Sequence, residues 1–178
     1  MLFKGSFMKH PPYDHYPEIT EDAISLRQVR KSDLPALLEI SFYDGKKAES
    51  IQDALEMQER IEADYQNGTS IHWGIVDPKT QEIVGTCGYY RGFDLGIGEL
   101  GCILRPQFQG RGFMNAALRG AIRFGQENLG LDQIVAITTR ENTRAIKLLE
   151  SLNFVKTSDL DDGMIHYQFQ GSLVQRRF

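Results

Sequence analysis

The stretch Glu99–Met114, ELGCILRPQFQGRGFM, decides the fold, because an apolar run ends there at a proline and a glycine turn follows. The run Glu99–Leu104 favours a strand, since it is short, apolar and closed by Pro106. Residues 112–128 then carry apolar side chains at the i, i+3, i+4, i+7 spacing of an amphipathic helix: Met114, Ala117, Leu118, Ala121 and Ile122. The stretch therefore predicts a strand, a turn and a helix in direct succession.

The turn Gln109–Met114 has the composition of an anion site. The first amides of a helix have no intrahelical partner and lie at the positive end of the helix dipole. Glycine lets phosphate oxygens reach the backbone without a Cβ in the way, and Arg111 adds a cation. The turn thus predicts phosphate binding, although a glycine-rich loop before a purely structural helix also fits these residues.

Other nucleotide-binding signatures fit the sequence poorly. The P-loop pattern GxxxxGK[ST] is absent. Residues 96–101, GIGELG, match GxGxxG, but an apolar strand follows them where dinucleotide binding needs a helix. We therefore interpret these glycines as a turn or bulge.

Outward from this centre, hydrophobic periodicity predicts an α/β (α+β) mixed sheet with about four helices. The sheet is expected to be mostly antiparallel, with one right-handed parallel crossover through the helix 112–128. Residues 1–22 are predicted to be an N-terminal extension, 23–170 a single domain and 171–178 a C-terminal tail. The expected strands are 24–29, 72–76, 82–90, 99–104, 133–139, 154–155 and 164–169, and the expected helices are 34–40, 48–66, 112–128 and 143–152.

Bulk properties narrow the class of protein. The chain has 178 residues, 41% apolar and 25% charged, as in an ordinary globular domain. No apolar run approaches the roughly 18 residues that cross a bilayer, and the N-terminus lacks a signal-peptide core, so we expect a cytoplasmic protein that does not insert in membranes. A net charge of -4 argues against nucleic-acid binding. The two cysteines and four histidines lack metal-ligand spacing, so no metal site is expected.

Two segments carry a family resemblance. The run LRPQFQGRGFMNAAL resembles motif A of the GNAT N-acetyltransferases, [QR]xxGx[GA], with Gln109 and Gly112 at its first fixed positions. Met114 replaces the last Gly/Ala, as in the branch resembling the ribosomal-protein-alanine acetyltransferases RimJ and RimL. The run RENTRAIKLLESLNF resembles motif B through Asn142, Ala145 and Phe154, with Asn153 in place of the usual glycine. The resemblance covers about residues 24–169.

The resemblance implies a GNAT-like fold and acetyl-CoA as cofactor. It implies that pantetheine binds the backbone of Ile103 and Leu104, and that Asn142 also contacts it, although Asn142 equally fits a helix N-cap. The acceptor would be a primary amine, either a protein N-terminus or a small amine. A homodimer is compatible with the family, but no apolar stripe argues for one. The residues whose amides would hold the pyrophosphate are Gln109, Gly110, Arg111, Gly112, Phe113 and Met114.

The catalytic groups are less completely specified. Glu99 is the first candidate for the general base, and a structural strand glutamate is the alternative. The tyrosine that protonates the thiolate in many relatives would fall at Leu149, and the serine of the RimJ/RimL branch at Ala145. The general acid is therefore missing from its usual places. Four other residues remain candidates for it: Tyr89, Tyr90, Tyr167 and Ser151.

Two further hypotheses stay open at this point. A domain without that acid could be a non-catalytic acyl-CoA sensor or interaction module. The turn could also bind a different nucleotide. We expect Trp73 to lie in the core or in a cleft wall and His72 to lie at the surface. Nothing in residues 34–68 or 155–170, where specificity is expected to arise, encodes a recognisable ligand.

Overall fold

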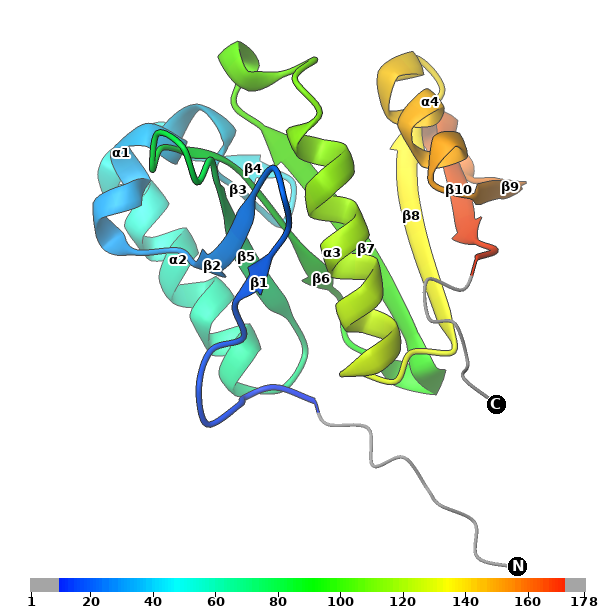
Figure 1. Ribbon diagram of the computed structural model, residues 1–178, viewed down its shortest axis with the longest axis horizontal. Coiled ribbons are helices and arrows are strands. Elements are labelled where there is room, and N and C mark those ends of the chain that lie inside the picture. Colours follow the sequence, from blue (N-terminus) through cyan, green and yellow to red (C-terminus); the bar gives the residue numbers. More distant parts are fainter. Residues whose placement is uncertain (1–9, 172–178) are drawn as a thin grey trace, which may run out of the picture.

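The computed structural model describes residues 10–171, which form a mixed sheet covered by helices on both faces (Figure 1). The strands of the large sheet lie in the order β1-β2-β5-β6-β7-β8-β10-β9, and β3 and β4 form a separate hairpin. The helices are α1 (Leu34–Leu37), α2 (Ile51–Gln66), α3 (Phe113–Glu127) and α4 (Thr143–Ser151). The strands are β1 (Ile19–Thr20), β2 (Ser25–Gln28), β3 (Phe42–Tyr43), β4 (Lys46–Lys47), β5 (Ile71–Val76), β6 (Ile83–Tyr90), β7 (Ile97–Leu104), β8 (Gln133–Thr139), β9 (Phe154–Asp159) and β10 (Met164–Phe169).

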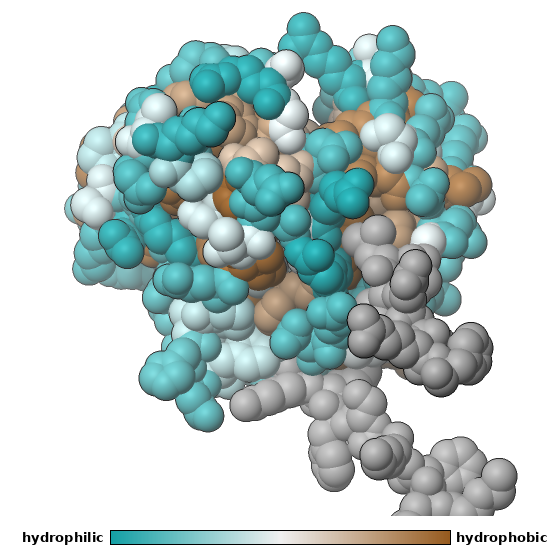
Figure 2. Space-filling view, viewed as in Figure 1, coloured by the Kyte–Doolittle hydropathy of each residue, from teal (hydrophilic) through white to brown (hydrophobic). Residues whose placement is uncertain are grey.

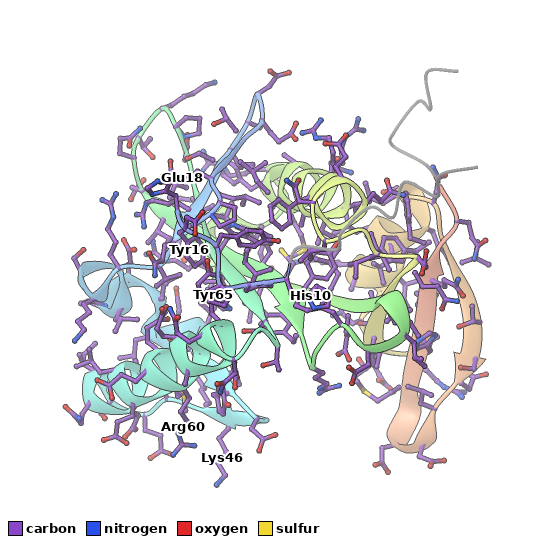
Figure 3. The ribbon with its side chains drawn as sticks, turned by 90° about the horizontal axis from the view of Figure 1, so that it is seen from below. His10, Tyr16, Glu18, Lys46, Arg60 and Tyr65 are labelled. Atoms are coloured by element: carbon purple, nitrogen blue, oxygen red, sulfur yellow. The ribbon has the colours of Figure 1, made fainter. Side chains whose placement is uncertain are left out.

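The two faces of the sheet have separate cores. Helices α3 and α4 pack on one face, where Leu118, Ile122 and Leu149 join the larger apolar cluster. Helix α1 packs on the other face, where Leu34 and Leu37 belong to a smaller cluster that α2 borders through Leu55. Figure 3 shows the sheet between α3 and α2. The pairs of β7 with β8 are parallel and all other strand pairs in the described part of the sheet are antiparallel, which confirms the expected crossover.

Most predicted elements are present, with local differences that have physical causes. The helix expected at 48–66 begins at Ile51, because a capping box lies at its start. The Ser50 hydroxyl accepts from the amide of Asp53, and the Asp53 carboxylate accepts from the amide of Ser50. The segment expected as one helix at 34–40 is only a short α-helix between two 3-10 turns. The last helix ends at Ser151 rather than Leu152, and Asn153 just beyond it has a φ of 64°, the left-handed conformation that commonly terminates a helix.

The sequence interpretation missed the hairpin β3–β4. Its strands pair Phe42 with Lys47 and Tyr43 with Lys46. The two residues between them, Asp44 and Gly45, both have positive φ, 49° and 74°. An Asp-Gly pair is a typical two-residue hairpin turn. The signal was present in the sequence, and the strands are so short that periodicity did not reveal them.

Residues 10–22 pack on the domain. Strand β1 pairs with β2, and the indole Nε1 of Trp73 donates to the carbonyl of Pro17 at 2.9 Å. The ring centroids of Tyr16 and Tyr65 lie 4.8 Å apart, and both side chains are labelled in Figure 3. Trp73 is fully buried, which confirms its expected place in the core. Residues 1–9 of the predicted extension and 172–178 of the predicted tail lie outside the described residues.

Three observations concern possible membranes, partners and metal ions. Within residues 10–171, no helix is both long and apolar enough to cross a membrane. Figure 2 shows that hydrophilic residues cover most of the displayed face, with apolar residues visible between them. In the same part of the chain, no group of three or more His, Cys, Asp or Glu side chains is placed to hold a metal ion.

Candidate active site

The central feature of the site is a split between β7 and β8. Their parallel pairing comprises Ile97 with Gln133, Gly98 with Ile134 and Glu99 with Val135, and it stops there. Beyond this point β7 continues along β6, whereas β8 continues along β10. The two central strands therefore diverge toward their carboxyl ends, where α3 and α4 begin (Figure 1).

The β7 edge of the split presents unpaired backbone groups. The amide of Arg105 donates to the carbonyl of Val84 in β6 at 2.9 Å. In the register that continues from this bond, Ile103 lies opposite Thr86. Because backbone groups alternate in direction along an antiparallel strand, the amide of Ile103 faces β6. The amides and carbonyls of Cys102 and Leu104 face the opening instead.

The turn after β7 is shaped by two glycines in the left-handed region. Gly110 has a φ of 73° and Gly112 a φ of 82°, and Gly112 is the N-cap of α3. A Cβ built on either glycine meets no atom within 4 Å, so the space beside each glycine is open. The first amides of α3 follow directly after Gly112 and have no intrahelical partner. The arrangement fits a phosphate group.

Aromatic packing holds the turn in place. The ring of Phe113 is buried and lies 6.3 Å from that of Phe108. The guanidinium of Arg111 lies over both rings, 4.9 Å from the centroid of Phe113 and 5.5 Å from that of Phe108. Phe113 and Arg111 thus stabilise the turn with their side chains. Their backbone amides are the groups that remain for a ligand. Met114 is partly buried against the larger core.

The predicted motifs A and B meet across the split. Nη1 of Arg144, in the first turn of α4, donates to the side-chain oxygen of Gln109 at 3.2 Å. Oδ1 of Asn142 accepts from the amide of Ala145 at 3.1 Å, so Asn142 is the N-cap of α4. The contact places two segments that are far apart in sequence at the same end of the opening.

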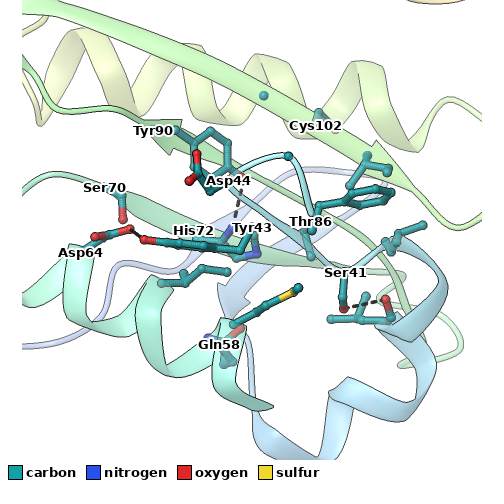
Figure 4. Close-up of a pocket in the computed structure, with 18 of the residues that line it drawn as sticks. Ser41, Tyr43, Asp44, Gln58, Asp64, Ser70, His72, Thr86, Tyr90 and Cys102 are labelled. Carbon is teal, nitrogen blue, oxygen red and sulfur yellow. Dashed lines mark hydrogen bonds between the residues drawn. The ribbon is translucent and has the colours of Figure 1, made fainter. Parts of the chain in front are cut away.

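A pocket of about 1110 Å³ lies on the α1/α2 side of the sheet (Figure 4). Its walls come from α1, α2, the β3–β4 hairpin and strands β5 to β8 and β10. Gly101 and Ile103 of β7 line one side of the split and Ile137 and Thr139 of β8 line the other. The pocket therefore reaches the opening between the two strands, where a thioester and an amine could meet.

Glu99 occupies the last paired position before the split. It shares a strand face with Gly101 and Ile103, since side chains two residues apart point the same way. Its carboxylate accepts from Nη1 of Arg91 at 3.0 and 3.1 Å. The side chain of Glu99 is 24% exposed and that of Arg91 is 74% exposed, so water reaches this ion pair. Arg91 also lines the pocket.

The tyrosine and serine candidates for the general acid have very different surroundings. The hydroxyl of Tyr89 donates to the carbonyl of Ala121, on the α3 face of the sheet. Tyr167 is buried in the larger core, and Ser151 donates to the carbonyl of Leu148 at the end of α4. Tyr90 alone among these four lines the pocket.

His72 also lines the pocket, so the expectation of a surface histidine was wrong. Its Nδ1 lies 3.0 Å from the hydroxyl of Tyr90. Burial lowers the pKa of His72 to about 4 and raises the pKa of Tyr90 well above its usual value. Sequence reasoning missed this contact because it joins two strands, and no motif marks either residue.

The comparisons with known proteins agree with this geometry. Residues 24–155 match the sequence profile of the acetyltransferase (GNAT) domain, and the chain belongs to this family. It is 29% identical over 149 residues to the N-acetyltransferase YoaA of Bacillus subtilis, with 79% of this chain and 84% of YoaA covered. It is 30% identical over 104 residues to the ribosomal protein uS5-alanine N-acetyltransferase of Escherichia coli, with 57% and 53% covered.

Solved structures show the same fold. RimJ of Mycobacterium smegmatis, in complex with CoA-disulfide, superposes with a TM-score of 0.73 at 19% identity, covering 82% of this chain and 81% of RimJ. The GNAT fold and the resemblance to the RimJ/RimL branch are therefore confirmed, and the chain is an N-acetyltransferase by family.

Proposed function

We propose that this protein transfers an acetyl group from acetyl-CoA directly to a primary amine. The observation that carries the proposal is the split between β7 and β8, with an open glycine turn at its end and a pocket at its side. Acetyl-CoA would supply an activated acetyl thioester. The split, the turn and the pocket together provide separate places for an extended cofactor arm, its phosphates and an acceptor.

The residues of the split would hold the cofactor through backbone groups. The exposed edge of β7 offers amides and carbonyls of Cys102 and Leu104 to the amides of pantetheine. Leu104 of the expected pair is retained, and Cys102 replaces Ile103, whose backbone groups face β6. The side chain of Ile103 still lines the pocket. The amide of Gln109 donates to the carbonyl of Pro106 at 3.3 Å, so the amides at Gly110–Met114 would bind the pyrophosphate, next to the open space at the two glycines. Asn142 would add its side-chain NH2 group, because its oxygen already caps α4.

Glu99 would act as the general base for the attacking amine. An amine must lose a proton as its nitrogen bonds to the acyl carbon, and a carboxylate at the closed end of the split can take that proton through water. Arg91 keeps the carboxylate oriented by a two-contact ion pair. Because the pair is accessible to water, a proton accepted there can leave to solvent.

The acceptor site would be the pocket beneath α2. Asp64 and Asp44 line it together with the cation Arg91, and a protonated amine can approach such carboxylates before it is deprotonated. The relatives differ in acceptor, since one acts on an alanine of ribosomal protein uS5 and some structural neighbours are named spermidine N-acetyltransferases. The acceptor panel for a test should therefore contain both peptide N-termini and small amines.

The test is release of free thiol from acetyl-CoA, measured across alanine-, serine- and methionine-initiated peptides, monoamines and polyamines. The proposal expects acceptor-dependent thiol release and one acetyl group added per amine by mass spectrometry. Absence of acetylation across the panel, together with no binding of CoA in calorimetry, would remove both the enzyme and the cofactor assignment.

An acyl-CoA sensor is the second candidate, and one observation favours it. Leu149, where many relatives have a tyrosine, is buried in the larger core, so α4 supplies no acid there. CoA binding without turnover on any acceptor would support the sensor. Tighter binding of ATP or NAD than of CoA would support a different nucleotide ligand.

A further inference from the structure

One pair of polar side chains in the pocket has no role in the chemistry described so far. Tyr90 projects from β6 and His72 from β5, both on the face that α2 covers. Their hydroxyl and Nδ1 atoms lie 3.0 Å apart, and the rings meet edge to face with centroids 5.8 Å apart (Figure 4). They are therefore in direct contact inside the proposed acceptor pocket.

The positions of both side chains are fixed by neighbouring backbone. A Cβ on Gly101 would lie 2.9 Å from the Tyr90 ring, so the missing side chain lets the ring lie against β7. The backbone of His72 is held by Tyr16, whose hydroxyl donates to the His72 carbonyl at 2.6 Å and accepts from the His72 amide at 3.1 Å. The phenol thus lies beside the strand segment that borders the split.

Burial fixes the protonation states of the pair. The lowered pKa of His72, about 4, keeps the imidazole neutral near pH 7, with a proton on one nitrogen. The raised pKa of Tyr90 keeps the phenol protonated. When His72 carries its proton on Nδ1, it donates to the Tyr90 oxygen and leaves the phenolic O–H free to donate elsewhere.

We propose that Tyr90 is the general acid for the departing CoA thiolate, and that His72 positions it and stabilises its anion. This inference rests on the proposed function. As the amine nitrogen bonds to the acyl carbon, the carbon–sulfur bond breaks and its electron pair stays on sulfur. The Tyr90 O–H then gives its proton to that sulfur, and the Nδ1–H of His72 donates to the phenolate. The proton that Glu99 removes from the amine, or one from water, restores the phenol.

The proton transfer depends on the pKa values of the Tyr90 phenol and of the leaving thiol, and burial acts on both. Burial that raises the pKa of Tyr90 also raises the pKa of the thiol of Cys102, on the neighbouring segment of β7. A sulfur anion expelled into the same poorly solvated region is likewise a stronger base than in water. The pKa values of the phenol and of the leaving thiol are therefore raised together, and proton transfer between the two groups stays accessible.

The kinetic test compares two adjacent tyrosines that point to opposite faces. Tyr90→Phe keeps the ring but removes the acid, and we expect kcat to fall about 100-fold or more while the Kd of acetyl-CoA stays within twofold. The matched control is Tyr89→Phe, which loses a hydroxyl bonded to Ala121 on the far face and should keep its kcat. A Tyr90→Phe variant that retains the kcat of an active wild type overturns the role of Tyr90 alone. A wild type that binds acetyl-CoA but acetylates no amine overturns the proposed function as well.

The positioning role of His72 has two separate readouts. His72→Asn places an amide nitrogen near the position of Nδ1, so it should retain more kcat than His72→Leu, with the same affinity for CoA. In ¹⁵N NMR of the protein without ligand, His72 should carry its proton on Nδ1, and Tyr90→Phe should shift that signal where Tyr89→Phe does not. A proton on Nε2, with Nδ1 accepting from Tyr90, would overturn the assignment.

Discussion

The glycine turn and the acceptor pocket both border the β7/β8 split, but they are built in different ways. The turn consists of the consecutive residues Gln109–Met114, and its proposed ligand groups are backbone amides positioned by the glycine conformations. The pocket collects side chains from α1 at Leu34 to β10 at Met164. A local backbone device can be recognised in a sequence, whereas a pocket assembled from distant side chains has no sequence pattern of its own. Predictions for the two regions should therefore separate cofactor binding from catalysis.

The largest expected effect is on catalysis at the split. Glu99→Gln removes the proposed base while preserving size, and we expect kcat to fall about 100-fold with the affinity for acetyl-CoA unchanged. The exposed Glu82, just before β6, gives a matched control as Glu82→Gln, which should behave as wild type. Steady-state kinetics with calorimetry separates the two quantities. Full activity in Glu99→Gln would assign Glu99 a structural role.

The next largest effect is expected on the pH dependence of the free energy of unfolding, through His72 in the pocket. Because His72 has a pKa of about 4 in the folded protein and an ordinary one near 6.5 when unfolded, the unfolded state binds more protons between these values. Stability should therefore be fully present above about pH 7 and fall as the pH drops toward 4. Between pH 7 and pH 5, His72 should account for a loss of about 2 kcal/mol in the free energy of unfolding.

Urea denaturation at the two pH values measures this loss. The variant His72→Asn should show a pH dependence smaller by the same amount, since asparagine does not titrate. An identical pH dependence in the two proteins would show that His72 is not held neutral by the fold.

A smaller effect is expected at the turn. Gly112→Ala should weaken CoA binding about tenfold, or 1.4 kcal/mol, because a residue with a Cβ resists a φ of 82° and narrows the open side of the turn. Gly163→Ala is the control, since Gly163 has a φ of 73° and equally open surroundings, but lies in the hairpin between β9 and β10. Both variants should lose similar stability. Equal CoA affinities in both would argue against phosphate binding at the turn.

The smallest effect on CoA affinity is expected from removing the hydrogen bond between Arg144 and Gln109, which joins the two motifs. Arg144→Ala and Gln109→Ala should each weaken CoA binding only a few-fold, because their 3.2 Å contact is exposed. A double-mutant cycle on the Kd of CoA should give a coupling of about 0.5 kcal/mol. Strict additivity would mean that the contact does not help to shape the cofactor site.

This contrast also explains how much the sequence could reveal. Strand β8 and the start of α3 follow from periodicity and a glycine turn, and their bounds agree with the structure to within a residue. The hairpin at Phe42–Lys47 escaped because its strands are two residues long and only the Asp-Gly turn marks it. The direction of the Ile103 amide depends on the β6–β7 register, which the sequence does not encode locally.

For the candidate catalytic groups too, the sequence identifies residues within a local pattern but not their tertiary contacts. Glu99 could be named because it belongs to the deciding strand, but its partner Arg91 lies across a strand pair. Tyr90 was one of four possible acids, and only tertiary structure separates it from Tyr89 on the opposite face. His72 carries no motif, and the pocket that it lines is assembled from residues far apart in the sequence.

A crystal structure of the protein with CoA tests the central claim most directly. The account predicts that pantetheine lies between β7 and β8, bonded to backbone groups of Cys102 and Leu104, with the pyrophosphate on the amides of Gly110–Met114. It also predicts the sulfur on the Tyr90 side of the split. CoA bound elsewhere on the protein, or a split filled by side chains and closed to the cofactor, would contradict it.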